Sequence, residues 1–87
     1  MIETLQNDLL KNSEKLIFGT DRVLKLLRND KLLRVYLSRN CNVNVKQDIQ
    51  LLSKGVEVVE LEYVNSEVGT ICKKPFSVSV VGLQRWR

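Results

Sequence analysis

The stretch Phe18-Gly19-Thr20-Asp21-Arg22-Val23-Leu24-Lys25 holds the change from strand to helix that decides the fold. An apolar run ends at Gly19, and apolar residues at helical spacing follow it. The start of a helix leaves backbone N–H groups unpaired at the positive end of the helix dipole. With Arg22 and Lys25 in the first turns, the stretch predicts a compact site for a phosphate group.

A second stretch has the same character. Its sequence is Ser66-Glu67-Val68-Gly69-Thr70, followed by Lys74-Pro75-Phe76-Ser77-Val78-Ser79-Val80-Val81. Polar turn residues and a glycine again stand at the edge of an apolar run. Asn65 and Ser66 are expected to cap a short helix here, and Pro75 is expected to end that segment.

Helices and strands alternate along the rest of the chain. Apolar periodicity predicts helices over residues 2–12, 20–29, 44–54 and 66–73. Short apolar runs predict strands over residues 15–18, 32–37, 56–63 and 76–83. We expect Thr20 to cap the second helix at its N-terminus and Gly55 to cap the third at its C-terminus. The alternation predicts a sheet with helices on both faces and right-handed crossovers between parallel strands.

The length and composition indicate one soluble domain over residues 1–87. No apolar stretch approaches the roughly 18 residues of a membrane span. The first residues, MIETLQNDLLKN, lack the positive charge and apolar run of a secretion signal. We therefore expect a cytoplasmic protein without a membrane partner.

Charge is unevenly distributed in this mildly basic chain, which has a net charge of +4. Residues 21–40 hold six basic residues against two acidic ones: Arg22, Lys25, Arg28, Lys31, Arg34 and Arg39 against Asp21 and Asp30. Residues 57–67 are acidic, with Glu57, Glu60, Glu62 and Glu67. The basic cluster favours nucleic acid as a partner, and a solvated helix face is the alternative explanation.

Several kinds of chemistry are excluded by composition. Without histidine, the chain has no His-dependent nucleophile and no His-based metal site. Cys41 and Cys72 are too few and too far apart in sequence for a structural zinc site, and both are expected to be apolar core residues. No glycine-rich cofactor loop is present. The chain is thus not expected to be an enzyme or to bind a metal, a cofactor or a small-molecule substrate.

These residues resemble a known family, the thirty-e proteins of the large ribosomal subunit, within the kink-turn-binding ribosomal proteins of archaea and eukaryotes. The similarity covers nearly the whole chain. It is carried by Phe18-Gly19-Thr20 with Val23 and Lys25, by residues 32–55, and by the run from Ser66 to Ser79. The resemblance implies a three-layer α/β/α sandwich around a four-stranded mixed sheet. It also implies binding, at one end of the sheet, to bent helix-bulge-helix RNA and association with ribosomal proteins.

The resemblance implies a site made by three loops. The first loop supplies Gly19, Thr20, Asp21, Arg22 and Lys25. The second supplies Ser38, Arg39 and Asn40, and the third supplies Val64, Asn65, Ser66, Glu67, Val68 and Gly69.

The chemistry of these residues suits RNA. Glycine lets a backbone approach closely, basic side chains neutralise phosphates, and Val64 and Val68 suit an unstacked base. Each role has a structural alternative. The two glycines also fit a turn and a tight helix contact, Val68 fits the core, and Glu67 fits the first turn of a helix.

The chain departs from the family pattern at two positions. Asp21 replaces a usual asparagine, so a group that donates and accepts becomes one that only accepts. Lys73 replaces a common glycine. A diverged paralogue that serves as a protein-interaction or regulatory module is therefore the second interpretation. A substrate-binding domain that accompanies an RNA methyltransferase ranks third, because the chain is too short to include the catalytic part.

Overall fold

A computed structural model describes residues 2–53 and 55–85 of the chain. Its helices are α1 (Ile2–Lys11), α2 (Thr20–Arg28), α3 (Val43–Leu52) and α4 (Asn65–Ile71), with a short 3-10 turn, η1 (Ser13–Lys15). Its strands are β1 (Leu16–Phe18), β2 (Leu32–Leu37), β3 (Glu57–Glu60) and β4 (Val80–Gln84). The predicted order of helices and strands is confirmed.

The four strands form one mixed sheet in the order β1-β4-β2-β3. β4 pairs antiparallel with both β1 and β2, and β2 pairs parallel with β3. The β2–β3 crossover runs through α3, as parallel neighbours require. The predicted four-stranded mixed sheet is confirmed.

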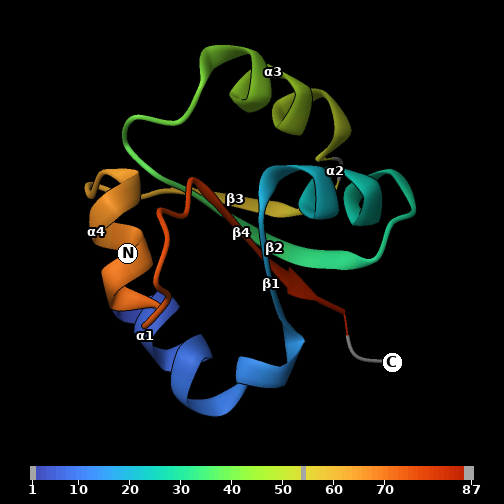
Figure 1. Cartoon of the computed structure of the whole chain (residues 1–87). Coiled ribbons are helices and arrows are strands. Elements are labelled where there is room, and N and C mark those ends of the chain that lie inside the picture. The colour runs from blue at the N-terminus through green and yellow to red at the C-terminus, as the bar shows by residue number, and fades with distance from the viewer. Residues whose placement is uncertain (1, 54, 86–87) are drawn as a thin grey trace.

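Helices cover both faces of this sheet (Figure 1). α1 and α4 lie over one face, where their apolar side chains form a core with Tyr36. α2 and α3 lie over the other face, where they pack on Val35 and Leu37. Neighbouring residues of β2 therefore point to opposite cores, as the pleat of a strand dictates. The three-layer α/β/α sandwich is confirmed.

β3 and β4 are shorter than expected, because the strand that pairs with them, β2, ends at Leu37. β3 ends at Glu60, which pairs with Leu37, the last residue of β2. β4 begins at Val80, which also pairs with Leu37. Residues 61–63 and 76–79 therefore have apolar sequences but no continuous strand beside them, and they run as irregular segments.

The predicted caps of α2 and α3 were wrong. Thr20 is the first residue of α2, and Gly19 occupies the N-cap position without a side chain to offer. α3 ends earlier than expected, at Leu52, and Ser53 is its C-cap. Gly55 lies in the following turn with φ of 75°, a left-handed conformation that favours glycine.

A buried polar cluster joins α1 to the centre of the sheet. The Asp8 carboxylate is only 3% exposed, and it accepts hydrogen bonds from the Tyr36 hydroxyl at 2.6 Å and from Arg34 Nη1 at 3.0 Å. Arg34 Nε also donates to Glu57 of β3 at 2.8 Å. Burial, followed by the hydrogen bond to Asp8, raises the pKa of Tyr36 above its ordinary value.

Candidate functional site

The three expected loops meet at one end of the sheet, where β1 and β2 end and β4 begins (Figure 1). Each loop donates or accepts a backbone hydrogen bond with residues 78–80. The bonds are Gly19 N–H to the Val80 carbonyl at 3.3 Å, Ser38 N–H to the Ser79 carbonyl at 2.9 Å, and Val78 N–H to the Asn65 carbonyl at 3.0 Å. The short segment before β4 thus holds all three loops together.

The first loop presents backbone N–H groups at the start of α2. Gly19 has φ of 111°, which other residues rarely adopt, and open space lies where its β-carbon would be. The Val23 N–H donates to the Gly19 carbonyl at 3.1 Å, so the helical ladder begins there. The N–H groups of residues 20–22 precede that ladder, and no side chain of the described residues caps the helix. These amides are placed to receive an anion.

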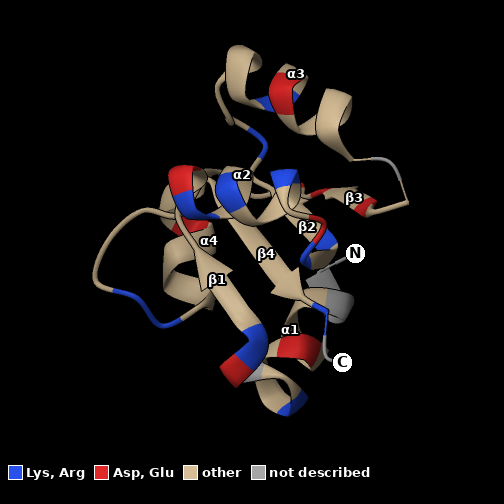
Figure 2. Ribbon diagram, turned by 90° about the vertical axis from the view of Figure 1, so that its right-hand side faces the viewer, with Lys and Arg blue, Asp and Glu red and all other residues tan. Residues whose placement is uncertain are grey.

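Basic side chains line the exposed side of α2. Arg22, Lys25 and Arg28 are all exposed and recur at spacings of three, which places them near one another on the helix surface. None of the three belongs to an ion pair within residues 2–53 and 55–85. Figure 2 shows these basic positions along α2 beside an acidic one. Arg28 was not among the expected contact residues, although its spacing from Lys25 was visible in the sequence.

Asp21 places a carboxylate in the first turn of the same helix, and its side chain is exposed. A negative charge is favoured there by the helix dipole. The carboxylate therefore stabilises α2 and also lowers the positive charge of the first loop.

A pair of asparagine side chains joins the second and third loops. Asn40 Oδ1 accepts from the backbone N–H of Asn65 at 2.8 Å, and Asn40 Nδ2 donates to Asn65 Oδ1 at 3.2 Å. Ser38, which is buried, donates its hydroxyl to the same Asn40 oxygen at 3.1 Å. Arg39 stays exposed between these anchored neighbours, and its N–H donates to the Tyr63 carbonyl at 2.7 Å.

The start of α4 differs from the expectation that Asn65 and Ser66 cap it. The N-cap is Val64, and Asn65 and Ser66 are the first two helical residues. Glu67 Oε1 accepts from the Val64 N–H at 3.1 Å, and Asn40 reaches the Asn65 N–H from the second loop. The start of α4 is thus capped by Glu67, which lies one turn along the helix, and by Asn40, which is distant in sequence.

The structure corrects the roles expected of Val68 and Gly69. Val68 of α4 is 1% exposed and points into the core that α1 and α4 form against the sheet. Its side chain is therefore not available to a base. Gly69 is buried too, and a β-carbon there would collide with the carbonyl oxygen of Phe76. Both residues serve packing, whereas Val64, Asn65, Ser66 and Glu67 are partly or fully exposed at the start of α4.

An aromatic side chain that was not among the expected RNA-binding residues lies beside α4. Phe76 is 56% exposed, and it borders a hollow of about 300 Å³ that is also lined by Ser66 and Thr70 of α4. In the same segment, Lys74 Nζ lies 4.6 Å from the centre of the Phe18 ring, at the end of β1. The segment before β4 therefore exposes an aromatic ring beside Ser66 and Thr70 of α4. Its signal in the sequence was an aromatic residue directly after a proline.

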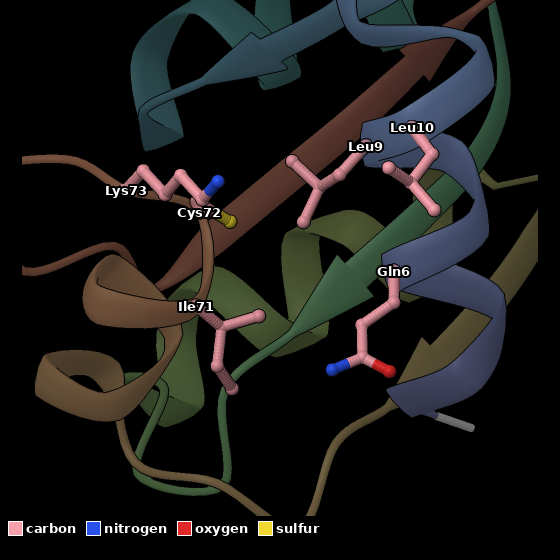
Figure 3. A pocket seen from close by; sticks show the side chains of 6 residues that line it. All are labelled: Gln6, Leu9, Leu10, Ile71, Cys72 and Lys73. Carbon is pink, nitrogen blue, oxygen red and sulfur yellow. The ribbon is translucent and has the colours of Figure 1, made fainter.

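A second hollow, of about 490 Å³, lies between α1 and the end of α4 (Figure 3). Its lining residues are Gln6, Leu9, Leu10, Ile71, Cys72 and Lys73. These residues share none of the hydrogen bonds that join the three loops. The hollow is therefore not part of the three-loop end.

The two cysteines, Cys41 beside the second loop and Cys72 after α4, are free thiols. Cys72 lies in the core and Cys41 is half-buried. Burial raises the pKa of both thiols, which disfavours the reactive thiolate. Within the described residues, no cluster of acidic or cysteine side chains could hold a metal ion, and no helix has the length and apolarity to cross a membrane.

Comparisons with known proteins agree with this architecture. The large ribosomal subunit protein eL30 of Sulfolobus acidocaldarius is 41% identical over 76 residues, which cover 85% of this chain and 73% of that protein. The eL30 protein of Archaeoglobus fulgidus is 32% identical, with 94% and 92% covered. The resemblance to the thirty-e proteins is confirmed.

Two solved structures share the fold at 18% identity. The Giardia lamblia 15.5kD RNA binding protein has a TM-score of 0.76 and covers 95% of this chain and 74% of its own. A Bacillus halodurans protein of unknown function has a TM-score of 0.69, with 85% and 75% covered.

Residues 4–85 match one protein family over nearly the whole chain. The family and the relatives above are ribosomal proteins, so the expectation that this chain is not an enzyme is confirmed. The chain belongs to the ribosomal protein L7Ae/L30e/S12e/Gadd45 family.

Proposed function

We propose that this protein is an RNA-binding component of the large ribosomal subunit and that its three-loop end recognises a bent helix-bulge-helix, or kink-turn, RNA. Its neighbours there would be ribosomal RNA and ribosomal proteins, in the cytoplasm. Family membership and the eL30 relatives support the ribosomal part of the proposal. The single observation that carries the RNA part is the joining of three loops beside the exposed cations and the N-terminal amides of α2.

The positive part of the site suits the RNA backbone. The amides at the start of α2 and the side chains of Arg22 and Lys25 lie on one loop and one helix turn, where a phosphate can accept from both. Arg28 continues the same side of the helix, and Arg39 adds a cation on the second loop. We assign phosphate contacts to these residues and to the backbone of Gly19 and Thr20.

The apolar part of the site suits an unstacked nucleotide. Phe76 exposes its ring, and Val64 is partly exposed at the start of α4. A straight A-form helix keeps its bases stacked, whereas a bulge offers a base face to a protein. Cations on α2 and an exposed ring beside α4 therefore favour bent, bulged RNA over a plain duplex. Asp21 can accept hydrogen bonds from a guanine edge, but its charge repels the phosphates that its basic neighbours attract.

The test is a titration of the protein with a kink-turn RNA and with a straight duplex of equal length, each at two salt concentrations. We expect tighter binding to the bent RNA at both concentrations. Three or four phosphate contacts predict a log–log salt slope of roughly −2 to −4. Equal affinity for the two RNAs would reduce the site to a basic patch.

A second candidate function rests on Asp21. A carboxylate at the start of α2 repels phosphate, which favours a protein-interaction or regulatory module with weak RNA affinity. Co-purification with ribosomal particles separates the two candidates, because a subunit protein stays with the particles and a free module does not.

A further inference from the structure

We propose that Asn40 and Asn65 are positioning residues, which fix Arg39 and the start of α4 in the geometry that RNA requires and do not themselves read the RNA. This inference rests on the proposed function. It reverses the role that the family resemblance implies for the two asparagines, which is direct contact with RNA.

The first step concerns the start of α4. Asn65 is the first residue of this helix, so its backbone N–H has no partner within the helix. Asn40 Oδ1 accepts from that N–H at 2.8 Å. Because a backbone N–H only donates, the Asn40 side chain must present its oxygen there. Its amide nitrogen then faces Asn65 Oδ1, to which it donates at 3.2 Å.

The second step concerns the remaining groups of the two amides. Asn40 Oδ1 also accepts from the Ser38 hydroxyl at 3.1 Å. Asn65 Nδ2 donates to the Ser79 hydroxyl at 3.3 Å. Both amide oxygens and one N–H of each amide are thus bonded within the protein. An RNA contact through Asn40 Oδ1, whose two lone pairs are both engaged, or through either bonded N–H would break the bonds that join the loops.

The third step concerns Arg39, which stands between Ser38 and Asn40. The Ser38 N–H donates to the Ser79 carbonyl at 2.9 Å, and the Arg39 N–H donates to the Tyr63 carbonyl at 2.7 Å. The backbone of Arg39 is therefore held by its own N–H and by that of the preceding residue, while its side chain remains exposed. A cation on a fixed backbone loses less freedom on binding than one on a mobile loop, so it contributes more to affinity.

The experiment compares Asn40→Ala, Asn65→Ala and the double variant, with Asn44→Ala, an exposed asparagine of α3, as the matched control. Each single variant is expected to bind kink-turn RNA roughly 5–10-fold more weakly, the scale of about one net hydrogen bond. The double variant should bind about as weakly as either single variant, because both residues act through one linkage. The control should bind like the wild type.

Two further readouts separate positioning from contact. In the free protein, hydrogen exchange of the Asn65 amide should accelerate in Asn40→Ala. Arg39→Ala should lower the salt slope by about one in the wild type and by less in the Asn40→Ala background. If Asn40→Ala does not fold, Asn40→Ser is the alternative, because its shorter side chain keeps polarity without reaching α4.

If the double variant lost affinity for kink-turn RNA by the product of the two single effects, roughly 25–100-fold, the two residues would make independent RNA contacts. This result would overturn the inference and leave the proposed function intact. Unchanged exchange of the Asn65 amide, or unchanged binding by the single variants, would overturn the inference too. Equal wild-type affinity for bent and straight RNA would overturn the proposed function, and this inference with it.

Discussion

The carbonyl oxygen of Phe76 lies so close to Gly69 that any β-carbon at position 69 would collide with it. The carbonyl carbon of Phe76 and the Cα of Ser77 are also near, at 3.2 and 3.3 Å from that position. Since the neighbours are backbone atoms, they cannot turn aside as a flexible side chain would. This contact fixes the distance between α4 and the segment before β4, and it therefore sets where the Phe76 ring stands.

Gly69→Ala should destabilise the protein by about 1–3 kcal/mol, because overpacking at a buried contact forces the backbone to shift. Denaturant unfolding followed by circular dichroism measures this change. Thr70→Ala is the matched control on the exposed side of the same helix, with an expected change within about 0.5 kcal/mol. Equal stability of the two variants would mean that the segment moves away from α4 without cost.

Tyr36→Phe should destabilise the protein by about 1–3 kcal/mol, because the buried Asp8 carboxylate loses a hydrogen bond without gaining a water. Tyr63→Phe, at a half-buried position, is the control and should change the free energy of unfolding by less than about 0.5 kcal/mol. Chemical denaturation at neutral pH compares the two variants. A neutral effect of Tyr36→Phe would show that Arg34 and Asn12 together satisfy Asp8.

Alkaline pH should reduce stability through Tyr36. Its pKa is raised in the folded protein by burial and by Asp8, from an ordinary value of 10.0. The unfolded chain therefore loses this proton at lower pH than the folded protein does. The stabilisation is fully present below about pH 10, and it decreases as the pH rises from there through the raised pKa. Unfolding curves from pH 8 to pH 11 should show a loss in the wild type that is smaller in Tyr36→Phe.

Lys25→Ala should weaken binding to bent and straight RNA alike and should lower the salt slope by about one, since one phosphate contact is removed. Lys31→Ala is the matched control, because Lys31 is exposed beyond the other end of α2. RNA titrations at two salt concentrations measure both effects. Wild-type binding by Lys25→Ala would place the RNA away from the first loop.

Asp21→Asn should tighten binding to kink-turn RNA by roughly 1 kcal/mol, because a charge that repels phosphate is removed and a donor is gained. The same change should cost α2 about 0.3–1 kcal/mol of stability, since the helix dipole favours the carboxylate. A paired titration and denaturation of this variant measures both. Weaker kink-turn binding would identify the carboxylate as a recognition group.

The sequence predicted the order of helices and strands because each one has a clear apolar period, as in Leu32–Leu37, whose bounds were predicted correctly. It did not predict where β3 and β4 begin and end, because those limits depend on the length of neighbouring strands. Apolar periodicity describes one segment of the chain at a time, whereas the limits of a strand depend on two segments that pair.

The candidate site was predicted in part for a similar reason. The cations of α2 could be found because helical spacing places Arg22 and Lys25 together. A tight helix contact was one expectation for Gly69, but its partner, Phe76, could not be predicted, because only the folded chain brings the two together. The link between Asn40 and Asn65 spans 25 positions and leaves no local pattern in the sequence.

The position of β4 in the sheet has a consequence for synthesis of the chain. β4 is the last strand along the chain, yet it lies between β1 and β2. The first three strands cannot form a continuous sheet before residues 80–84 have left the ribosome, because β1 has no partner until then. The apolar residues of both cores stay without their central strand during that interval. The sheet is thus completed only when β4 is inserted between two strands made much earlier.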